Sequence, residues 1–453
     1  MTRVWVLVLG LIGGAAMAMP PPPTVFAITG VTVVPMDTER VVDGQTVIVR
    51  DGRIEAIGPD LAIPKDAMTI DGRGRFLMPG LAEMHAHVPP QAHDAQLIED
   101  TLFLYVANGI TFARSMLGAP HHLELRERAA RGEIVSPRIY TSGPSLNGNS
   151  VPTPVAAREM VAEQKRAGYD FLKIHPGLDR PRYDAIVAAA DEHDIPFGGH
   201  VPAAVGLARA LEAGQATIDH LDAFFPPLLR GGASLADTES MFFGWNLAGE
   251  VDESKIEPLV RRVRDARVWI VPTEALMQHL LLPEPSAERL AQRDIMRYVP
   301  RATRAQWVEA KRGMIRQAAY DPALVARFID VRAKLMKALQ DAGAGLLLGS
   351  DAPQVFNVPG FSIHDELRML VDAGLTPYEA LATGNVNVAR FLGESDEFGT
   401  VEIGKRADLV LLEANPLADV ANASRIAGVM LNGRWLPVRE LTAGLEQIAQ
   451  RND

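Results

Sequence analysis

Cysteine is absent from the 453-residue sequence. Its absence excludes disulfide bonds, thiolate metal ligands and a cysteine nucleophile, and it removes the cysteine that a bacterial lipoprotein anchor needs. Basic residues are also comparatively few, because the formal net charge is −11 and no run of Lys or Arg interrupts the acidic balance. This charge pattern argues against a nucleic-acid-binding protein.

Long apolar runs are absent as well. No stretch beyond the N-terminus approaches the ~20 apolar residues that a membrane-spanning helix needs. At the N-terminus, Arg3, the apolar run 4–12 and the small-x-small site Ala16-Met17-Ala18 predict a signal peptide over residues 1–18. We therefore expect a periplasmic or secreted protein without stable membrane insertion after cleavage. The alternative is a single uncleaved anchor.

The two ends of the chain carry similar patterns. Short alternating runs in residues 24–75, with Asp51-Gly52 as a turn, predict antiparallel strands. Matching runs return in residues 400–445, with Asn432-Gly433 as a hairpin turn. We expect these two segments to form one composite β-sandwich domain, which encloses residues 76–399.

The enclosed segment has a repeating pattern of short apolar runs separated by helical stretches. This alternation predicts an α/β protein with a parallel sheet, and eight units predict a (β/α)8 TIM barrel. Residues 222–267 and 274–343 are longer than the other intervals and predict helical insertions at the barrel mouth. Such insertions also offer contact surfaces for a homo-oligomer. The predicted strands are residues 80–84, 110–113, 138–141, 171–174, 195–198, 216–219, 268–271 and 345–348.

Several histidines and one aspartate follow these predicted strands directly, where barrel enzymes place their chemistry. Alternate residues of a strand point to the same side, so His85 and His87 should both face the barrel axis. Four imidazoles and a carboxylate that converge from different strands suit zinc or a similar divalent ion. The predicted metal-site residues are His85, His87, Lys173, His200, His220 and Asp351.

Lys173 is the unusual member of this set. It lies in an apolar strand between Leu172 and Ile174, where a free ammonium group is costly. An inward lysine at this position needs either an ion pair or conversion to a carbamate.

The motifs around these residues resemble the amidohydrolase superfamily, in the branch that holds imidazolonepropionase-like, prolidase-like and ochratoxinase-like hydrolases. The resemblance covers nearly all of the chain after the signal segment. A segment such as 375–381 after the eighth strand is also typical of this branch. The matching stretches are residues 76–81 running into 83–87, then Lys173, His200, His220, Ser350-Asp351 and residues 404–410.

The resemblance implies a two-metal centre with divalent ions such as zinc. Its first ion would be held by His85, His87 and Asp351, and its second by His200 and His220. Carboxylated Lys173 would bridge the two. A hydroxide bridging the two cations would attack a carbonyl that one ion polarises. Asp351, the expected catalytic residue, would take the proton of the attacking water and pass it to the leaving amine.

The substrate is less sharply indicated. Prolidase-like relatives carry a Gly-Gly-His motif shortly after the third strand, whereas this sequence has Asn147-Gly148-Asn149 there. Candidates for substrate contacts at the ends of other strands are Arg114, Tyr140, His175, Thr273 and Glu274.

We expect the chain to hydrolyse an amide bond in a small molecule, such as a dipeptide or an N-acyl amino acid. A second interpretation is a hydrolase of cyclic amides or lactones, which the same metal centre could support. A third is a metal-dependent binding protein without turnover. The proton-transfer group Asp351 argues against the third, since a binding protein has no need of one.

Overall fold

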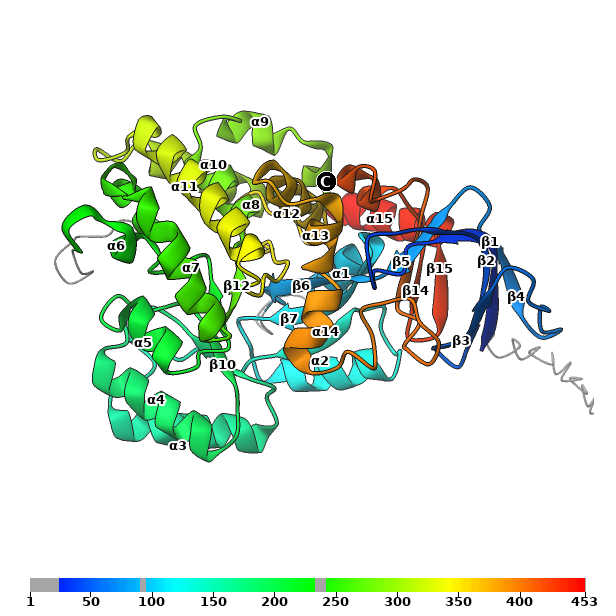
Figure 1. Ribbon diagram of the computed structural model, residues 1–453, viewed down its shortest axis with the longest axis horizontal. Helices are drawn as coiled ribbons and strands as arrows, with labels where there is room; N and C mark the ends of the chain where they lie inside the picture. Colours follow the sequence, from blue (N-terminus) through cyan, green and yellow to red (C-terminus); the bar gives the residue numbers. More distant parts are fainter. Residues whose placement is uncertain (1–23, 90–94, 233–241, 453) are drawn as a thin grey trace, which may run out of the picture.

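The computed structural model describes residues 24–89, 95–232 and 242–452. A β-rich module lies at one end of the molecule and a larger α/β part at the other (Figure 1). The predicted signal peptide, residues 1–18, lies outside the described residues. Within the described part of the chain, no helix has both the length and the apolar character needed to cross a membrane.

The β-rich module is a single eight-stranded sheet that joins both ends of the chain. The strand order is β15-β14-β13-β5-β1-β2-β3, and β4 pairs with β1. The turns fall where the sequence predicts them, because Asp51 and Asn432 both adopt a positive φ and each precedes a glycine that does the same. The strands are β1 (Val25–Val33), β2 (Val42–Arg50), β3 (Arg53–Gly58), β4 (Met68–Asp71), β5 (Phe76–Pro79), β13 (Leu409–Leu412), β14 (Ile426–Leu431) and β15 (Arg434–Pro437).

This module differs from the expected sandwich in two respects. Its strands pair continuously, because β1 binds β4 along Phe26–Thr29 and β5 along Thr32–Val33. Strand β5, placed in the barrel by the sequence-based boundary at residue 76, therefore belongs to this sheet and pairs with β13. The chain then ends in a helix, α15 (Val438–Asn452), which packs against α1 and β14.

The α/β part contains seven of the eight predicted parallel strands, in two sheets. One has the order β6-β7-β8 and the other β12-β11-β10-β9, and all pairs are parallel. The strands are β6 (Leu81–Ala86), β7 (Ile110–Ser115), β8 (Arg138–Thr141), β9 (Leu172–Ile174), β10 (Phe197–Gly199), β11 (Thr217–Asp219) and β12 (Trp269–Val271). The predicted α/β class is confirmed.

The eighth predicted strand, residues 345–348, is not a strand in the structure. It makes one parallel bridge, between Leu346 and Ile270 of β12, and the Leu348 carbonyl accepts from the Met84 N–H of β6. A parallel bridge between Ser142 and Phe171 links the end of β8 to the start of β9. Single parallel bridges therefore connect neighbouring segments where regular strand pairing is missing. Residues 345–348 pair only briefly, and the chain then turns away toward Asp351.

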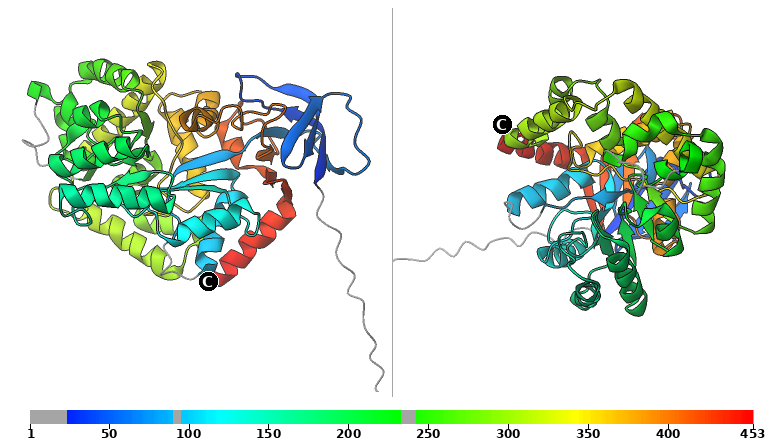
Figure 2. Two further views of the ribbon diagram at one scale, coloured as in Figure 1. Left: turned by 90° about the horizontal axis from the view of Figure 1, so that it is seen from below. Right: turned by 90° about the vertical axis from the view of Figure 1, so that its left-hand side faces the viewer.

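Helices surround the parallel strands, as the end view in Figure 2 shows. Helix α3 begins where Thr153 accepts a hydrogen bond from the Ala156 N–H and ends at Gly168 with φ 88°, which only glycine adopts readily. The first group of helices is α1 (Ala95–Ala107), α2 (His121–Ala130), α3 (Pro154–Ala167), α4 (Arg180–Glu192), α5 (Gly206–Glu212), α12 (Phe361–Asp372), α13 (Pro377–Ala382) and α14 (Val386–Leu392).

The two long predicted insertions are helical in their described residues. Buried apolar side chains of both insertions join some of those of the parallel strands in one large core cluster, and others of the second insertion form a separate cluster around Trp307. The first contains α6 (Phe225–Leu228), α7 (Ile256–Asp265) and three short 3-10 helices, and the second contains α8 (Glu274–Leu281), α9 (Ala287–Ala291), α10 (Arg301–Ile315) and α11 (Pro322–Asp341).

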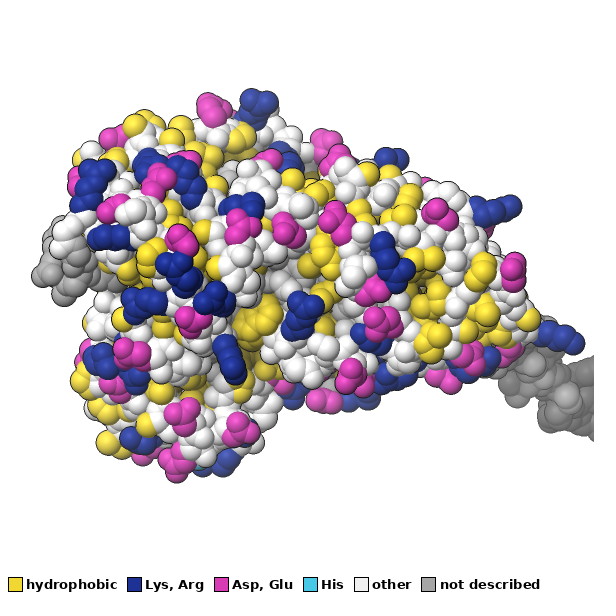
Figure 3. Space-filling model, viewed as in Figure 1, with side chains coloured by type: hydrophobic (Ala, Val, Ile, Leu, Met, Phe, Trp, Pro, Cys, Tyr) yellow, Lys and Arg dark blue, Asp and Glu magenta, His cyan; other side chains and the backbone are white. Residues whose placement is uncertain are grey.

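Basic and acidic side chains are interspersed over the face of the molecule that Figure 3 shows. Independently of this view, the chain has many ion pairs within one helix, such as Arg180 with Asp184 and Lys337 with Asp341. Exposed pairs of this kind contribute little to stability. The acidic net charge is therefore spread out on this face.

Candidate metal centre

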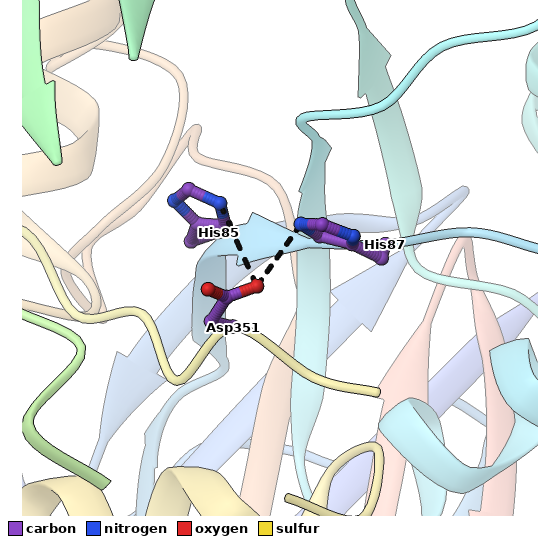
Figure 4. A group of neighbouring side chains, drawn as sticks. All are labelled: His85, His87 and Asp351. Atoms are coloured by element: carbon purple, nitrogen blue, oxygen red, sulfur yellow. Dashed lines mark ion pairs between the residues drawn. The ribbon is translucent and has the colours of Figure 1, made fainter. Parts of the chain in front are cut away.

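Three of the predicted ligands meet where β6 ends. His85 is the fifth residue of β6, His87 follows the strand, and Asp351 comes from the segment after the Leu346 bridge (Figure 4). Asp351 Oδ1 lies 3.0 Å from His87 Nε2 and 3.7 Å from His85 Nε2. One donor atom from each of the three residues lies within 4.8 Å of the donor atoms of the other two. These three side chains could hold one cation.

The other two predicted histidines continue this group as a row of rings. The ring centres lie 5.3 Å apart for His87 and His85, 4.6 Å apart for His85 and His220, and 4.6 Å apart for His220 and His200. His200 follows β10 and His220 follows β11. The ends of three parallel strands and the Asp351 segment thus bring four imidazoles and a carboxylate together.

Lys173 lies among these rings and is completely buried. Its Nζ is 3.6 Å from Asp219 Oδ2 and makes no hydrogen bond within the described residues. Gly199 makes room for it, since a Cβ at that position would lie 2.8 Å from the Cδ of Lys173. Burial lowers the pKa of the amine, although the carboxylates of Asp219 and Asp351 act in the opposite direction. A lower pKa favours the neutral amine, the form that carboxylation requires.

Hydrogen bonds orient the imidazole rings of His200 and His220. The Thr273 hydroxyl donates to the Pro272 carbonyl at 2.7 Å, so it must accept from Nδ1 of His220, 2.8 Å away. His220 Nε2 is then free of a proton; it is buried and has no hydrogen-bond partner in the described structure. Nδ1 of His200 lies 2.7 Å from Asp222 Oδ2. Polar partners on Nδ1 commonly fix metal-binding histidines with the other nitrogen toward the ion.

The electrostatic setting also suits a cation. Burial holds the pKa of His85 and His220 well below the ordinary range, so both rings are neutral, as metal binding requires. Asp351 Oδ1 and Asp219 Oδ2 are buried oxygen atoms without a hydrogen-bond donor among the described residues. Buried polar atoms normally have partners. A divalent cation would supply the missing partner of Asp351 Oδ1, so the residues present fit a metal ion.

Glu83 supports this centre although the sequence analysis gave it no role of its own. Its Oε1 accepts from the backbone N–H groups of His85 at 3.0 Å and Ser350 at 2.8 Å, and its Oε2 lies 2.5 Å from the Ser350 hydroxyl. Burial raises the pKa of Glu83 to about 8. The Glu83 carboxyl thus connects the segment that carries His85 with the segment that carries Asp351. The alternating pattern of strand residues in the sequence does not predict this connection.

Arg114 has a different setting from the substrate contact that the sequence suggests. It is 1% exposed and donates to the Met84 carbonyl at 2.7 Å, to Thr217 Oγ1 at 3.1 Å and to Asp219 Oδ1 at 3.3 Å. Asp219 Oδ2 is in turn 3.0 Å from His85 Nδ1. Arg114 therefore holds Asp219 behind the metal-site histidines and has no free face for a substrate.

Of the four remaining predicted substrate residues, three are engaged by other groups of the protein and one lies near the centre with a partly exposed side chain. Tyr140 stacks on Phe171 with ring centres 5.4 Å apart, and its hydroxyl donates to the Asp170 carbonyl, so it is a packing residue. Thr273 contacts His220, as described above. Glu274 is buried and paired with Arg332 at 2.7 Å. His175, which is partly exposed and stacks on His200 at 4.9 Å, stays close enough to the centre to meet a substrate.

Two further features of the centre were not predictable from the sequence. Phe243, from the first insertion, places its ring centre 5.1 Å from that of His220. In addition, His220, Thr273 and Asp351 have φ values of 65°, 53° and 62°. Non-glycine residues rarely adopt this conformation, and such strain concentrates at functional sites.

A family model described as the amidohydrolase family matches residues 76–436, most of the chain. The chain belongs to the amidohydrolase family. Imidazolonepropionase from Rubrobacter xylanophilus is 25% identical over 429 residues, 86% of this chain and 91% of that protein. Imidazolonepropionase from a Geobacillus species is 22% identical over 434 residues, 83% and 86% of the two chains.

Solved structures share the fold of this amidohydrolase. A bottromycin amidohydrolase superposes with a TM-score of 0.71 at 22% identity, covering 95% of this chain and 91% of that one. A Xaa-Pro dipeptidase with bound methionine in its active site gives a TM-score of 0.64 at 17% identity, covering 91% and 100%. The predicted family is confirmed, and the chain is a hydrolase that acts on carbon–nitrogen bonds. Members of the family generally bind divalent metal ions, for which the His85, His87 and Asp351 group is a candidate site.

Proposed function

We propose that this amidohydrolase cleaves the amide bond of dipeptides or N-acyl amino acids at a centre of two divalent metal ions. The row of four imidazoles that ends at Asp351 carries the proposal. Those rings are too many for one tetrahedral ion together with Asp351 and Lys173. Zinc suits a set of imidazole and carboxylate donors.

The ligands divide into two groups. His85, His87 and Asp351 would hold the first ion, and His200 and His220 the second. Lys173, carboxylated on its amine, would bridge them. When bound, such ions lower the pKa of water and polarise a carbonyl.

The chain's own residues then have distinct tasks. Asp351 would accept the proton of the attacking water and deliver it to the leaving amine, acting as base and then as acid. Asp222 and Thr273 keep the rings of His200 and His220 in one orientation. Glu83 keeps the backbone under His85 and Asp351 in place. Arg332 donates to the His220 and Pro272 carbonyls, which supports the strained loops that follow β11 and β12.

Hydrolysis of a cyclic amide is the second candidate. Two relatives that match over most of their length are imidazolonepropionases, whose name states a ring with a carbonyl group as the substrate. The structural neighbour that is a Xaa-Pro dipeptidase favours the linear amide. Lactone opening would use the same groups. The family assignment supports a hydrolase over a binding protein without turnover.

The decisive experiment combines elemental analysis with a substrate screen. Purified protein is assayed for bound zinc, manganese, cobalt, nickel and iron, and then for turnover of dipeptides, N-acyl amino acids, cyclic amides and lactones. We expect two metal equivalents and cleavage of a linear amide. Turnover of cyclic amides alone would favour the second candidate, and failure to cleave any amide or ester would refute both.

We also propose that the protein is exported and that its seven parallel strands close into one barrel, with residues 345–348 in the eighth position. Arg3, the apolar run 4–12 and the small-x-small site at 16–18 support export. The bridges that continue the parallel order between the two sheets support the barrel. N-terminal sequencing of protein from the periplasm or culture medium tests export, and a chain that still starts at Met1 in the cytoplasm contradicts it.

A further inference from the structure

A cavity of about 270 Å³ opens beside the candidate metal centre. His87 forms part of its wall, together with residues directly after β6 and after Asp351, among them Pro89 and Pro353. Its outer wall comes from α1 and from the second insertion, which contributes Tyr298 and Trp307. The cavity thus shares a side chain with the centre and extends away from it.

The walls of this cavity are apolar and firmly packed. Trp307 lies edge-on to Phe356, with ring centres 6.1 Å apart, and Tyr298 stacks on Phe361 at 5.0 Å. Leu104 is also buried in this wall, and Leu117, which is 39% exposed, lies at the cavity's edge. Aromatic and aliphatic walls of this kind bind apolar groups through burial of surface.

The charged group and several other polar groups in the same walls are already engaged within the protein. Asp100 accepts two hydrogen bonds from Arg451, at 2.6 and 2.9 Å. The Thr101 hydroxyl donates to the Leu97 carbonyl, and the side-chain amide of Asn452 donates to the Tyr298 carbonyl. These groups offer no unpaired charge to a ligand. A charged substituent in the cavity would lose its hydration without gaining a partner.

We propose that this cavity binds an uncharged apolar group, of branched-aliphatic or aromatic size, that flanks the scissile amide of the substrate. The inference rests on the proposed function and narrows it, because it selects amides with an apolar substituent over those with small or charged ones. His87 connects the two sites: its Nε2 faces Asp351, while its ring forms part of the cavity wall.

Two substrate series test the proposal with the wild-type enzyme. One varies the acyl group of N-acyl glycines from acetyl to butanoyl to phenylacetyl, and the other varies the amino acid of N-acetyl glycine, valine, phenylalanine and aspartate. Burial of a branched or aromatic group should raise kcat/KM by about 10- to 100-fold in at least one series. A flat response in both series would overturn the proposal while leaving amide hydrolysis intact.

The variant Thr303→Trp tests the location. Thr303 lines the cavity from α10, so a large side chain there should occupy it. We expect Thr303→Trp to lower kcat/KM at least 10-fold for the preferred apolar substrate and by less than twofold for N-acetylglycine. Gln306→Trp, on the exposed side of the same helix, is the matched control and should change neither. Equal losses on both substrates in Thr303→Trp would contradict the assignment.

Calorimetric binding keeps the proposal testable if no amide is cleaved, the outcome that refutes the proposed function. N-phenylacetylglycine and N-acetylglycine are titrated into the wild-type protein and into Thr303→Trp. Tighter binding of the phenylacetyl compound to wild type only, by about 10-fold or more, would support the cavity independently of turnover. No difference between the two compounds would overturn it.

Discussion

The two sides of the candidate metal centre are supported in different ways. Near His85 and Asp351, a buried carboxyl accepts from main-chain N–H groups. Near His200 and His220, polar side chains bind ring nitrogen atoms. Glu83 serves the first side and Asp222 and Thr273 the second. The first arrangement fixes where the chain runs, and the second mainly fixes how a ring is turned, although Asp222 also accepts from the Val201 N–H at 3.3 Å. The two sides should therefore respond differently when their supporting groups are removed.

The largest effect is expected at Asp351, the residue proposed to carry both a metal ion and a proton. Asp351→Asn keeps an oxygen donor but cannot take a proton, so kcat should fall about 10²- to 10⁴-fold with the fold retained. Steady-state kinetics and circular dichroism measure this. Asp184→Asn, a surface carboxylate paired with Arg209, is the control and should retain full activity. Unchanged kcat in Asp351→Asn would remove the proton-transfer role.

Lys173→Ala should separate the two sides most clearly. It removes the proposed bridge, so bound metal should drop well below two equivalents per chain, with the second ion lost first. Elemental analysis after desalting gives the stoichiometry. Two equivalents retained by this variant would contradict the bridging role and leave the 3.6 Å pair with Asp219 as the function of Lys173.

Glu83→Ala should destabilise the fold, because it leaves the buried N–H groups of His85 and Ser350 without an acceptor. Each such loss costs about 1–3 kcal/mol, so the free energy of unfolding should fall by roughly 3 kcal/mol in a denaturant titration. Glu83→Gln retains an acceptor oxygen and should cost less.

The raised pKa of Glu83 also predicts a pH dependence. Its pKa in the folded protein, about 8, lies above the ordinary value of 4.5, so its contribution to stability is full below pH 4.5 and is lost as the pH rises to 8. Glu83→Gln should flatten the stability profile in this window. A profile identical to that of the wild type would show that Glu83 titrates normally.

The smallest effect is expected on the second side. Asp222→Ala frees the ring of His200, which should weaken metal affinity about 10- to 100-fold. It also leaves the Val201 N–H without its acceptor, so the free energy of unfolding of the metal-free protein should fall by about 1 kcal/mol, less than in Glu83→Ala. Competition with a chromophoric chelator measures the affinity, and Asp222→Asn, whose oxygen can still accept from Nδ1, should recover part of it. A stability loss as large as that of Glu83→Ala would erase the contrast between the two sides.

The four histidines and Asp351 could be placed together from the sequence because each follows a short predicted strand, whereas Lys173 lies within one, and parallel strands bring such positions to one edge. The histidine row was predictable for this reason. The partners of those histidines were not, since Thr273 and Asp222 reach them only through loops with positive φ at residues such as His220 and Leu221. Local patterns do not encode the direction of such loops.

Two other differences have physical causes. Arg114 looked like a substrate contact because it lies near the end of a strand, yet its length lets it cross the interior to Asp219 and Thr217. Residues 345–348 look like a strand by composition, but only Leu346 makes a bridge there. Glycine at 345 and 349 allows close approach of Trp269 and His85, which favours compact packing over a regular ladder.

The sheet that joins both chain ends has a consequence for synthesis. Strand β5 pairs with β13, whose partner residues lie about 330 positions further along the chain. At a translation rate of 5–20 residues per second, the N-terminal strands would wait roughly 15 to 65 seconds for that neighbour to emerge. During this interval the edge of β5 is open to pairing with other chains. The yield of active protein should therefore depend on how well the unpaired edge of β5 is protected until β13 is available.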